Sequence, residues 1–174
     1  MVLLLSRERL QPFRDLTASD IDAIELHQAA MQLNVALVAV TALTEIALRN
    51  AVHSHLSRTL GTEDWLRNPP EFVIWQDTER ESIVRAELQA RRETSRNRGE
   101  VISRSQIITR LTLHFWKRLF ARTYDRMLWR SVRGVFPNKA CTRATIARHL
   151  EVLHRIRNRL AHHEFVNTSQ LHCR

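Results

Sequence analysis

The residues best suited to chemistry lie near the C-terminus, in the stretch HRIRNRLAHHEF at residues 154–165. This stretch places an arginine, an amide and a histidine at Arg157, Asn158 and His162. Histidine transfers protons near neutral pH, and arginine both holds a phosphate and stabilises the charge that develops on it. The three residue types together therefore suit acid–base chemistry on a phosphate ester.

Helical geometry would bring these three side chains to one side of a helix. On a wheel of about 100° per residue, Arg157, Asn158 and His162 flank Ala161 within an arc of about 140°. Asn158 and His162 are four residues apart and can touch. The apolar residues of the same helix fall on the opposite side, at Leu153, Ile156 and Leu160. We therefore expect a shallow, phosphate-sized site on the polar side, where His154 also falls.

The adjacent pair His162–His163, followed by Glu164, raises the question of a metal site. Adjacent histidines on a helix diverge by about 100°, and no third ligand follows at helical spacing. We therefore expect no metal and no cofactor. His163 points away from the other three and is expected to support the helix end or an interface.

The composition favours a single all-α domain. A chain of 174 residues fits one core, and a content of three Gly and four Pro favours helices over a β-sandwich or barrel. We expect one domain over residues 1–174, with an N-terminal extension at 1–19 and a short tail at 165–174. About four helices with short connections predict an antiparallel helical bundle.

The apolar periodicity predicts where these helices lie. A long helix is expected from Asp20 to about Ser57, buried on much of its circumference, and Gly61 is expected to stop it. Its apolar stretch at residues 33–48 is shorter than a membrane span, so we expect a core helix and no membrane association. Further helices are expected at about 77–93, with Ile83, Val84 and Leu88 inward, at about 103–124 as one helix, and at about 142–161.

The charge balance indicates a polyanionic partner. The net charge is +9, and nearly all of the basic residues are arginine, because Lys117 and Lys139 are the only lysines. Arginine matches phosphate geometry, which makes RNA or DNA a plausible partner, and Arg155 and Arg159 are the expected RNA contacts. Codon bias and solubility explain the arginine excess equally well. The basic residues at 91–98 fit either an RNA backbone or a solvated face.

A second polar cluster lies in the long helix at Glu45, Arg49, Asn50 and His53. Glu45 and Arg49 are four residues apart, which favours an ion pair on one face. With Asn50, this pair either supports the phosphate site or fixes the register of the helix, and the two interpretations carry equal weight. The four tryptophans lie among apolar neighbours and are expected in the core. The two cysteines show no paired spacing, which fits a reducing cytoplasm.

The sequence resembles a known family. R-N-x-x-x-H is the signature motif of HEPN domains, and an ordered set of further segments is similar to the Abi-like proteins of bacterial abortive infection. The matching segments are EIALRNAVHSHL, GTEDWL, LTLHFWKRLF, YDRMLW, FP and RNRLAHHE. They cover residues 42–164. The motif alone is weak, whereas the ordered set is much more specific.

The resemblance implies an all-α bundle and a metal-independent endoribonuclease that acts as a toxin or phage-defence effector. By resemblance, His162 is the general base or acid, Arg157 binds the scissile phosphate and Asn158 orients the histidine. Two protomers usually pair so that their motif helices face one cleft, and attack by a ribose 2′-hydroxyl leaves a 2′,3′-cyclic phosphate. RNA, a second copy of the chain and an antitoxin or regulatory partner are the partners implied.

Other functions compete with this one. The main alternative is a non-catalytic RNA-binding or scaffold module of the same fold. Such modules commonly lose the Arg or His of the motif, and both are present here. A DNA-binding regulator is a third possibility, although no clear helix-turn-helix segment is found.

The chain also departs from the family pattern. His114 stands where the family commonly has a glycine before Phe-Trp, and we expect it to be a solvated or core-edge histidine. The chain ends ten residues after Glu164, where relatives continue with another helical segment, which indicates a shortened tail.

Overall fold

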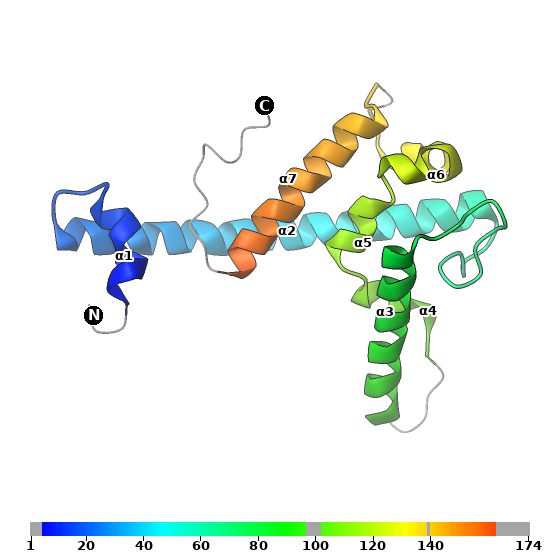
Figure 1. The fold of residues 1–174 in the computed structure, drawn as a ribbon, viewed down its shortest axis with the longest axis horizontal. Coiled ribbons are helices and arrows are strands. Elements are labelled where there is room, and N and C mark those ends of the chain that lie inside the picture. Colours follow the sequence, from blue (N-terminus) through cyan, green and yellow to red (C-terminus); the bar gives the residue numbers. More distant parts are fainter. Residues whose placement is uncertain (1–4, 97–101, 139, 163–174) are drawn as a thin grey trace. The chain divides into compact units, whose positions relative to one another are not determined.

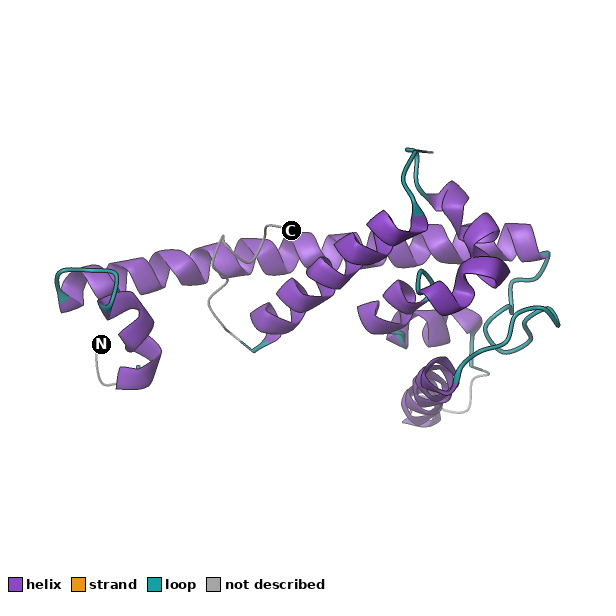
Figure 2. Ribbon diagram, turned by 45° about the horizontal axis from the view of Figure 1, so that its top comes forward, coloured by secondary structure: helices purple, strands orange, loops and turns teal. Residues whose placement is uncertain are grey.

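A computed structural model describes residues 5–96, 102–138 and 140–162. Helices, turns and loops make up all of this described part, which holds no strand (Figure 2), so the predicted all-α class is confirmed. The elements in chain order are α1 (Arg7–Arg14), α2 (Asp20–Leu60), α3 (Asp77–Arg96), α4 (Arg104–Arg110), α5 (Leu113–Arg118), η2 (Arg122–Tyr124), α6 (Asp125–Val132), η3 (Arg133–Val135) and α7 (Arg143–Ala161), as labelled in Figure 1.

The chain divides into two compact units. The first unit comprises residues 1–42 and 155–174, and the second unit comprises residues 43–154. The long helix α2 and the last helix α7 each contribute residues to both units. The expectation of one domain over the whole chain stays a prediction.

The first unit contains a helix, α1, within the segment 1–19 that the sequence predicts to be an N-terminal extension. α1 begins at the cap residue Ser6, whose hydroxyl accepts a hydrogen bond from the Arg9 backbone N–H at 3.3 Å. Phe13 packs into a small buried cluster with Ala23 and Ala30 of α2. The Arg14 guanidinium pairs with the Asp20 carboxylate at 2.9 Å. These contacts fold α1 back onto the start of α2.

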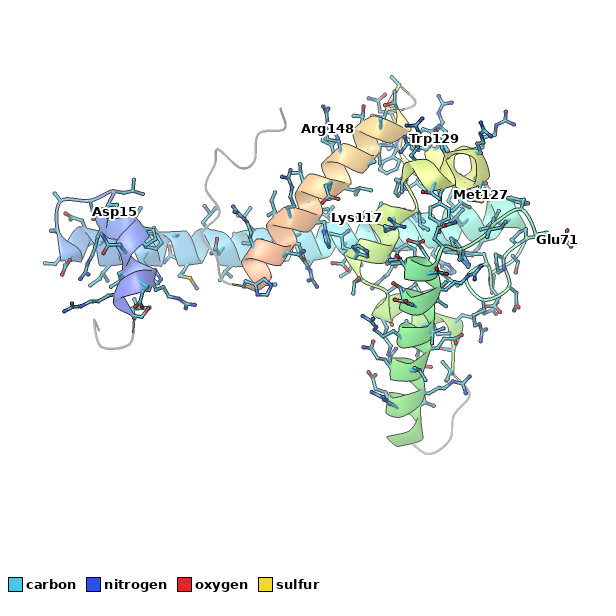
Figure 3. All side chains as sticks on the ribbon, viewed as in Figure 1. Asp15, Glu71, Lys117, Met127, Trp129 and Arg148 are labelled. Carbon is cyan, nitrogen blue, oxygen red and sulfur yellow. The ribbon has the colours of Figure 1, made fainter. Side chains whose placement is uncertain are left out.

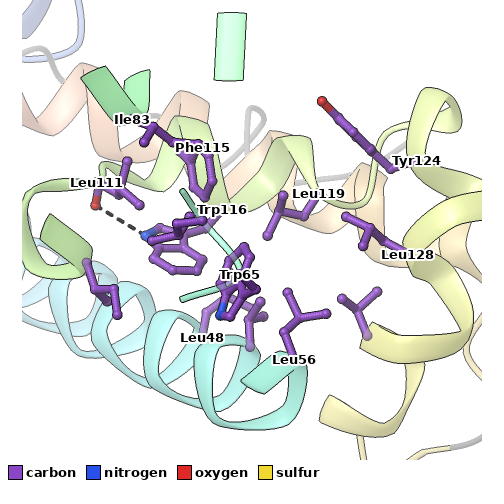
Figure 4. Close-up of a cluster of buried hydrophobic side chains, with 14 of the residues drawn as sticks. Leu48, Leu56, Trp65, Ile83, Leu111, Phe115, Trp116, Leu119, Tyr124 and Leu128 are labelled. Carbon is purple, nitrogen blue, oxygen red and sulfur yellow. Dashed lines mark hydrogen bonds between the residues drawn. The ribbon is translucent and has the colours of Figure 1, made fainter. Parts of the chain in front are cut away.

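The second unit has a core built around aromatic side chains (Figure 4). Trp65 and Trp116 are fully buried, and their rings lie 6.3 Å apart. Trp75 is also buried and donates its indole N–H to the Leu66 carbonyl at 3.0 Å. Trp129 is partly buried and packs against the same core. The prediction that the tryptophans anchor the core is therefore confirmed.

The predicted stop of α2 is confirmed at Gly61. The helix ends at Leu60, and Gly61 has φ +68°, a left-handed conformation that costs a glycine little.

Helix α3 turns an unexpected set of side chains inward. Ile83 is buried as predicted, but Val84 and Leu88 are exposed, so the predicted apolar side was wrong at these two positions. Between Asp77 and Thr94, the other buried residues of α3 are Glu79, Ala86, Ala90 and Thr94. Small residues face inward because α4 and α5 pack against α3, as Figure 1 shows for α4.

The predicted helix at 103–124 is broken into shorter pieces. α4 ends at Arg110, Leu111 takes an extended conformation, and α5 begins after Thr112. The buried Trp116 indole donates to the Leu111 carbonyl at 3.2 Å, the bond drawn in Figure 4, and the Leu111 side chain is itself buried. Tertiary packing thus stabilises a break that no glycine or proline marks in the sequence.

The apolar stretch of α2 is not the buried core helix that we predicted. Val35 and Leu43 are each 67% exposed and Val40 is 58% exposed. The sequence places apolar residues around most of this segment, and among the described residues many of these side chains are exposed. The helix that carries the stretch runs for 41 residues and is long and apolar enough to cross a membrane, a test that core helices and signal sequences also pass.

Candidate functional site

Helix α7 carries the predicted site, and its apolar stripe is where the sequence placed it. Ile146, Leu150 and Leu160 are buried, Leu153 is partly buried against the core of the second unit, and Ile156 is half-buried. Apolar residues at this spacing fix which side of a helix faces the protein. The prediction of the core side of α7 is therefore confirmed.

The three motif residues lie together at the C-terminal end of α7, within the first unit. Arg157 is exposed and Asn158 is half-buried, while the helix itself ends at Ala161. His162 follows directly and is exposed. Its backbone N–H donates to the carbonyls of Asn158, at 3.2 Å, and Arg159, at 3.1 Å. These two bonds continue the last helical turn, so His162 keeps its place relative to Asn158.

This arrangement can hold and protonate an anionic group at the surface. Arginine offers a fork of N–H donors, and the histidine five residues further on offers either a proton or a lone pair. Both side chains are open to solvent, so a large substrate can reach them without a pocket. These residue types are the ones that the sequence predicted for chemistry on a phosphate ester.

The residues predicted to support the motif lie in the other unit. Glu45 and Arg49 are half-buried and Asn50 is exposed, all three on the part of α2 that belongs to the second unit. The Arg49 Nε donates to the Asn50 Oδ1 over a long 3.4 Å. Their predicted role beside Arg157 and His162 therefore stays a prediction.

The predicted RNA contacts are described only in part. Arg155 is exposed and Arg159 is half-buried at the end of α7. His163, Glu164 and the tail at 165–174 lie outside the described residues, as do the last two positions of the basic stretch at 91–98.

His53, the fourth residue of the polar cluster with Glu45, Arg49 and Asn50, has a structural role. The Trp65 indole N–H donates to the His53 Nδ1 at 3.1 Å, which ties α2 to the loop that follows it. Burial lowers the pKa of His53, Glu63 opposes this shift and Arg104 adds to it. The lowered pKa favours the neutral imidazole, and this agrees with the hydrogen bond, because the Nδ1 atom must carry no proton to accept from Trp65.

The sequence did not reveal a second group of titratable side chains, which we call the α5–α7 cluster and define as His114, Lys117, Glu151 and His154. The rings of His114 and His154 lie 5.5 Å apart. The Lys117 ammonium, labelled on α5 in Figure 3, contacts the Glu151 carboxylate at 2.6 Å and the His154 Nδ1 at 3.2 Å. All four belong to the second unit. The two helices are far apart in sequence, so no local spacing signals the cluster.

The described residues form no metal-binding group, and the comparisons with known proteins found no match. Within residues 5–96, 102–138 and 140–162, no three His, Cys, Asp or Glu side chains are arranged to hold a metal ion. No protein-family model, no curated protein and no solved structure matches the chain.

Proposed function

We propose that the chain is a nucleic-acid-cleaving enzyme of the helical HEPN type. More particularly, we propose a metal-independent endoribonuclease of the Abi-like kind, which acts in the bacterial cytoplasm as a toxin or phage-defence effector. The observation that carries the proposal is the exposure of Arg157 and His162 at the same end of α7, with Leu160 buried on the other side. The arginine-rich surface supports a polyanionic substrate.

The proposed reaction uses these groups without a cofactor. His162 takes the proton of a ribose 2′-hydroxyl, whose oxygen attacks the adjacent phosphorus while Arg157 neutralises the charge on the non-bridging oxygens. The bond to the 5′-oxygen breaks, and that oxygen takes a proton from a protonated histidine. The products are a 2′,3′-cyclic phosphate and a 5′-hydroxyl. DNA has no 2′-hydroxyl and would not be cut.

A second copy of the chain would supply the second histidine. In a symmetric dimer one imidazole acts as base and the other as acid around one phosphate. The exposed apolar side chains of α2, among them Val35, Val40 and Leu43, support association, because such surface is normally covered by a partner. We also propose that an antitoxin or another regulatory protein restrains the toxic activity.

Cleavage of purified RNA in EDTA tests the enzyme. We expect wild type to cleave RNA and to leave 2′,3′-cyclic ends, while His162→Ala and Arg157→Ala each lose about 100-fold or more in rate, as the loss of an acid–base or charge-stabilising group costs. Arg148→Ala and His149→Ala, at exposed positions nearer the start of α7, are the matched controls and should cleave as wild type does.

Two outcomes would reject the ribonuclease. Cleavage that disappears in EDTA and returns with a metal would contradict a metal-independent mechanism. RNA binding without cleavage by wild type, unaffected by His162→Ala, would favour the non-catalytic RNA-binding module. Growth arrest on expression, relieved by His162→Ala but not by His149→Ala, would support the role as a toxin.

Light scattering at micromolar concentration tests the dimer. We expect twice the chain mass for wild type and a shift toward the monomer for Val40→Glu, because a charge in an apolar contact is left without a partner. Glu25→Gln, at an exposed polar position of the same helix, is the control. A monomeric wild type that floats with lipid vesicles would show that α2 meets a membrane and would overturn the dimer.

A further inference from the structure

The second unit contains a groove of about 530 Å³, lined by the loop that follows α2 and by the first turns of α3. Three of the side chains that line it are buried, namely Val73 and Trp75 of the loop and Ile83 of α3. Ile74 and Val84 also line it, and they are 56% and 53% exposed. A concave and mainly apolar surface of this size is typical of a binding site.

The loop side of the groove is held in place by hydrogen bonds within the loop. The Trp75 indole N–H donates to the Leu66 carbonyl at 3.0 Å, and the Val73 backbone N–H donates to the Pro70 carbonyl at 2.8 Å. The groove is therefore formed before a ligand arrives, and binding does not have to order it.

The segment 72–75 presents an extended backbone at the groove. Phe72 and Ile74 are exposed while Val73 and Trp75 are buried, which is the alternation of an extended chain. In the described part of the chain, neither the backbone N–H nor the carbonyl of Ile74 has a hydrogen-bond partner. A peptide in extended conformation can pair with such a backbone, as an added strand pairs with the edge of a sheet.

The apolar surface continues beyond the groove. Phe72 lies on the same side of the extended segment as Ile74, and Leu88 follows Val84 by one turn of α3. Both Phe72 and Leu88 are exposed. Single exposed apolar residues are common, whereas a contiguous group marks an interaction site. A small molecule in the groove would leave Phe72 and Leu88 uncovered, so the extent of the surface favours a segment of a partner protein.

The charges around the groove favour an acidic segment. Arg67 is already paired, with the Asp64 carboxylate at 2.8 Å and with the Glu87 carboxylate at 3.9 Å. Arg80, one turn before Val84 on α3, is exposed, and its guanidinium has no partner in the described part of the chain. A carboxylate brought by the partner can therefore pair with Arg80, whereas a carboxylate near Glu87 would be repelled.

We propose that this groove binds an extended, apolar segment of a partner protein that carries one acidic residue. Apolar side chains of the segment pack against Ile74 and Val84, its backbone pairs with that of Ile74, and its carboxylate pairs with Arg80. Main-chain hydrogen bonds give affinity in this mode of binding, and side-chain contacts give specificity. The groove contains neither Arg157 nor His162, so the proposal does not depend on the proposed cleavage.

Selection of short random peptides against the full chain supplies the probe. We expect the enriched peptides to combine alternating apolar residues with an adjacent Asp or Glu. Methyl NMR with a synthetic copy of an enriched peptide should show saturable shifts of Ile74 and Val84, while Ile21, an exposed apolar residue of the first unit, should not move. Ile74→Asp should weaken binding about tenfold or more, because it places an unpaired charge in an apolar contact.

An exchange of charges gives the result that non-specific apolar adhesion would not produce. Arg80→Glu should weaken binding about tenfold, because it replaces an attraction by a repulsion between like charges. A peptide with Lys in place of its acidic residue should bind Arg80→Glu more tightly than it binds wild type. Arg85→Glu, at an exposed position of α3 that does not line the groove, is the matched control and should bind as wild type does.

Two outcomes would overturn the proposal. The first is equal binding of the peptide by wild type and Arg80→Glu, or an enriched peptide that shifts neither Ile74 nor Val84. The second is saturation of these two methyl resonances by decanoate while no peptide is enriched, which would assign the groove to a small amphiphile.

Discussion

Replacing the Glu79 carboxylate by an amide should destabilise the second unit more than any other change of a single charge on α3. The Glu79 side chain is 1% exposed. It accepts hydrogen bonds from the Arg118 Nε at 2.5 Å and from the Tyr124 hydroxyl at 2.6 Å. The Tyr124 oxygen in turn accepts from the Gln76 backbone N–H at 3.0 Å. This chain of bonds joins α3 to α5 and η2.

The magnitude follows from the two bonds that Glu79→Gln weakens. A hydrogen bond to a charged group contributes about 1.5–3 kcal/mol, and breaking a buried ion pair costs about 3–5 kcal/mol. Arg118 is 31% exposed and recovers part of this loss by contacting water, which favours the lower end of the range. The amide of glutamine can still accept one of the two bonds. We therefore expect a loss of about 3 kcal/mol in the free energy of unfolding.

Urea unfolding followed by tryptophan fluorescence measures this change, since Trp65, Trp75 and Trp116 are buried in the same core. Glu81→Gln, two residues further along α3 at an exposed position, is the control and should lie within about 0.5 kcal/mol of wild type.

A pH series adds a second readout. Burial alone would raise the pKa of Glu79, but the hydrogen bonds from Arg118 and Tyr124 outweigh it, and the pKa lies below its ordinary value. A lowered carboxylate pKa gives stability that is present above the unfolded pKa and is lost as the pH falls through the folded one. The difference between wild type and Glu79→Gln should therefore shrink only below about pH 4.5. Equal stability of the two proteins at pH 7 would refute the reasoning.

Two further predictions concern histidines of α2. Burial lowers the pKa of His53, Glu63 opposes this shift and Arg104 adds to it, so the contribution of His53 to stability should be lost as the pH falls below about 6.5. The free energy of unfolding of wild type should therefore drop more between pH 7 and pH 5 than that of His53→Gln. An equal drop in both proteins would argue against the hydrogen bond from Trp65. A Cβ at Gly134 would lie 2.5 Å from the His55 ring, so Gly134→Ala should cost about 1 kcal/mol in thermal unfolding, and His55→Ala should relieve that cost.

The helix boundaries show what local patterns can predict. The absence of glycine and proline from 20–60, the stop at Gly61 and the apolar steps along α7 each act through neighbours in the chain, and the structure agrees with all three. The break between α4 and α5 was missed because its cause is the bond from Trp116 to Leu111 inside a packed core. The small inward residues of α3 were missed because hydrophobicity ranks Val84 above Ala86, whereas close packing against α4 and α5 selects the smaller side chain.

The burial of α2 was wrongly predicted because burial, like the break between α4 and α5, depends on tertiary packing. Apolarity alone predicts burial, and the sequence of 33–48 is apolar on most of its circumference. Whether a helix is buried depends on how much surface the rest of the chain can place against it, and Val35, Val40 and Leu43 remain exposed. That quantity is set by the tertiary structure and is absent from any local pattern.

The motif of α7 and the α5–α7 cluster likewise differ in whether sequence or tertiary structure determines them. The sequence by itself determined the motif of Arg157, Asn158 and His162, because their spacing places them within about 140° of one side of a helix wherever that helix lies. Only the tertiary structure decided that His114 and Lys117 meet Glu151 and His154, since these contacts join α5 to α7 across more than 30 positions of the chain. The physical reason is range: helical periodicity relates residues within a few turns, whereas packing of buried side chains relates helices that the sequence keeps apart.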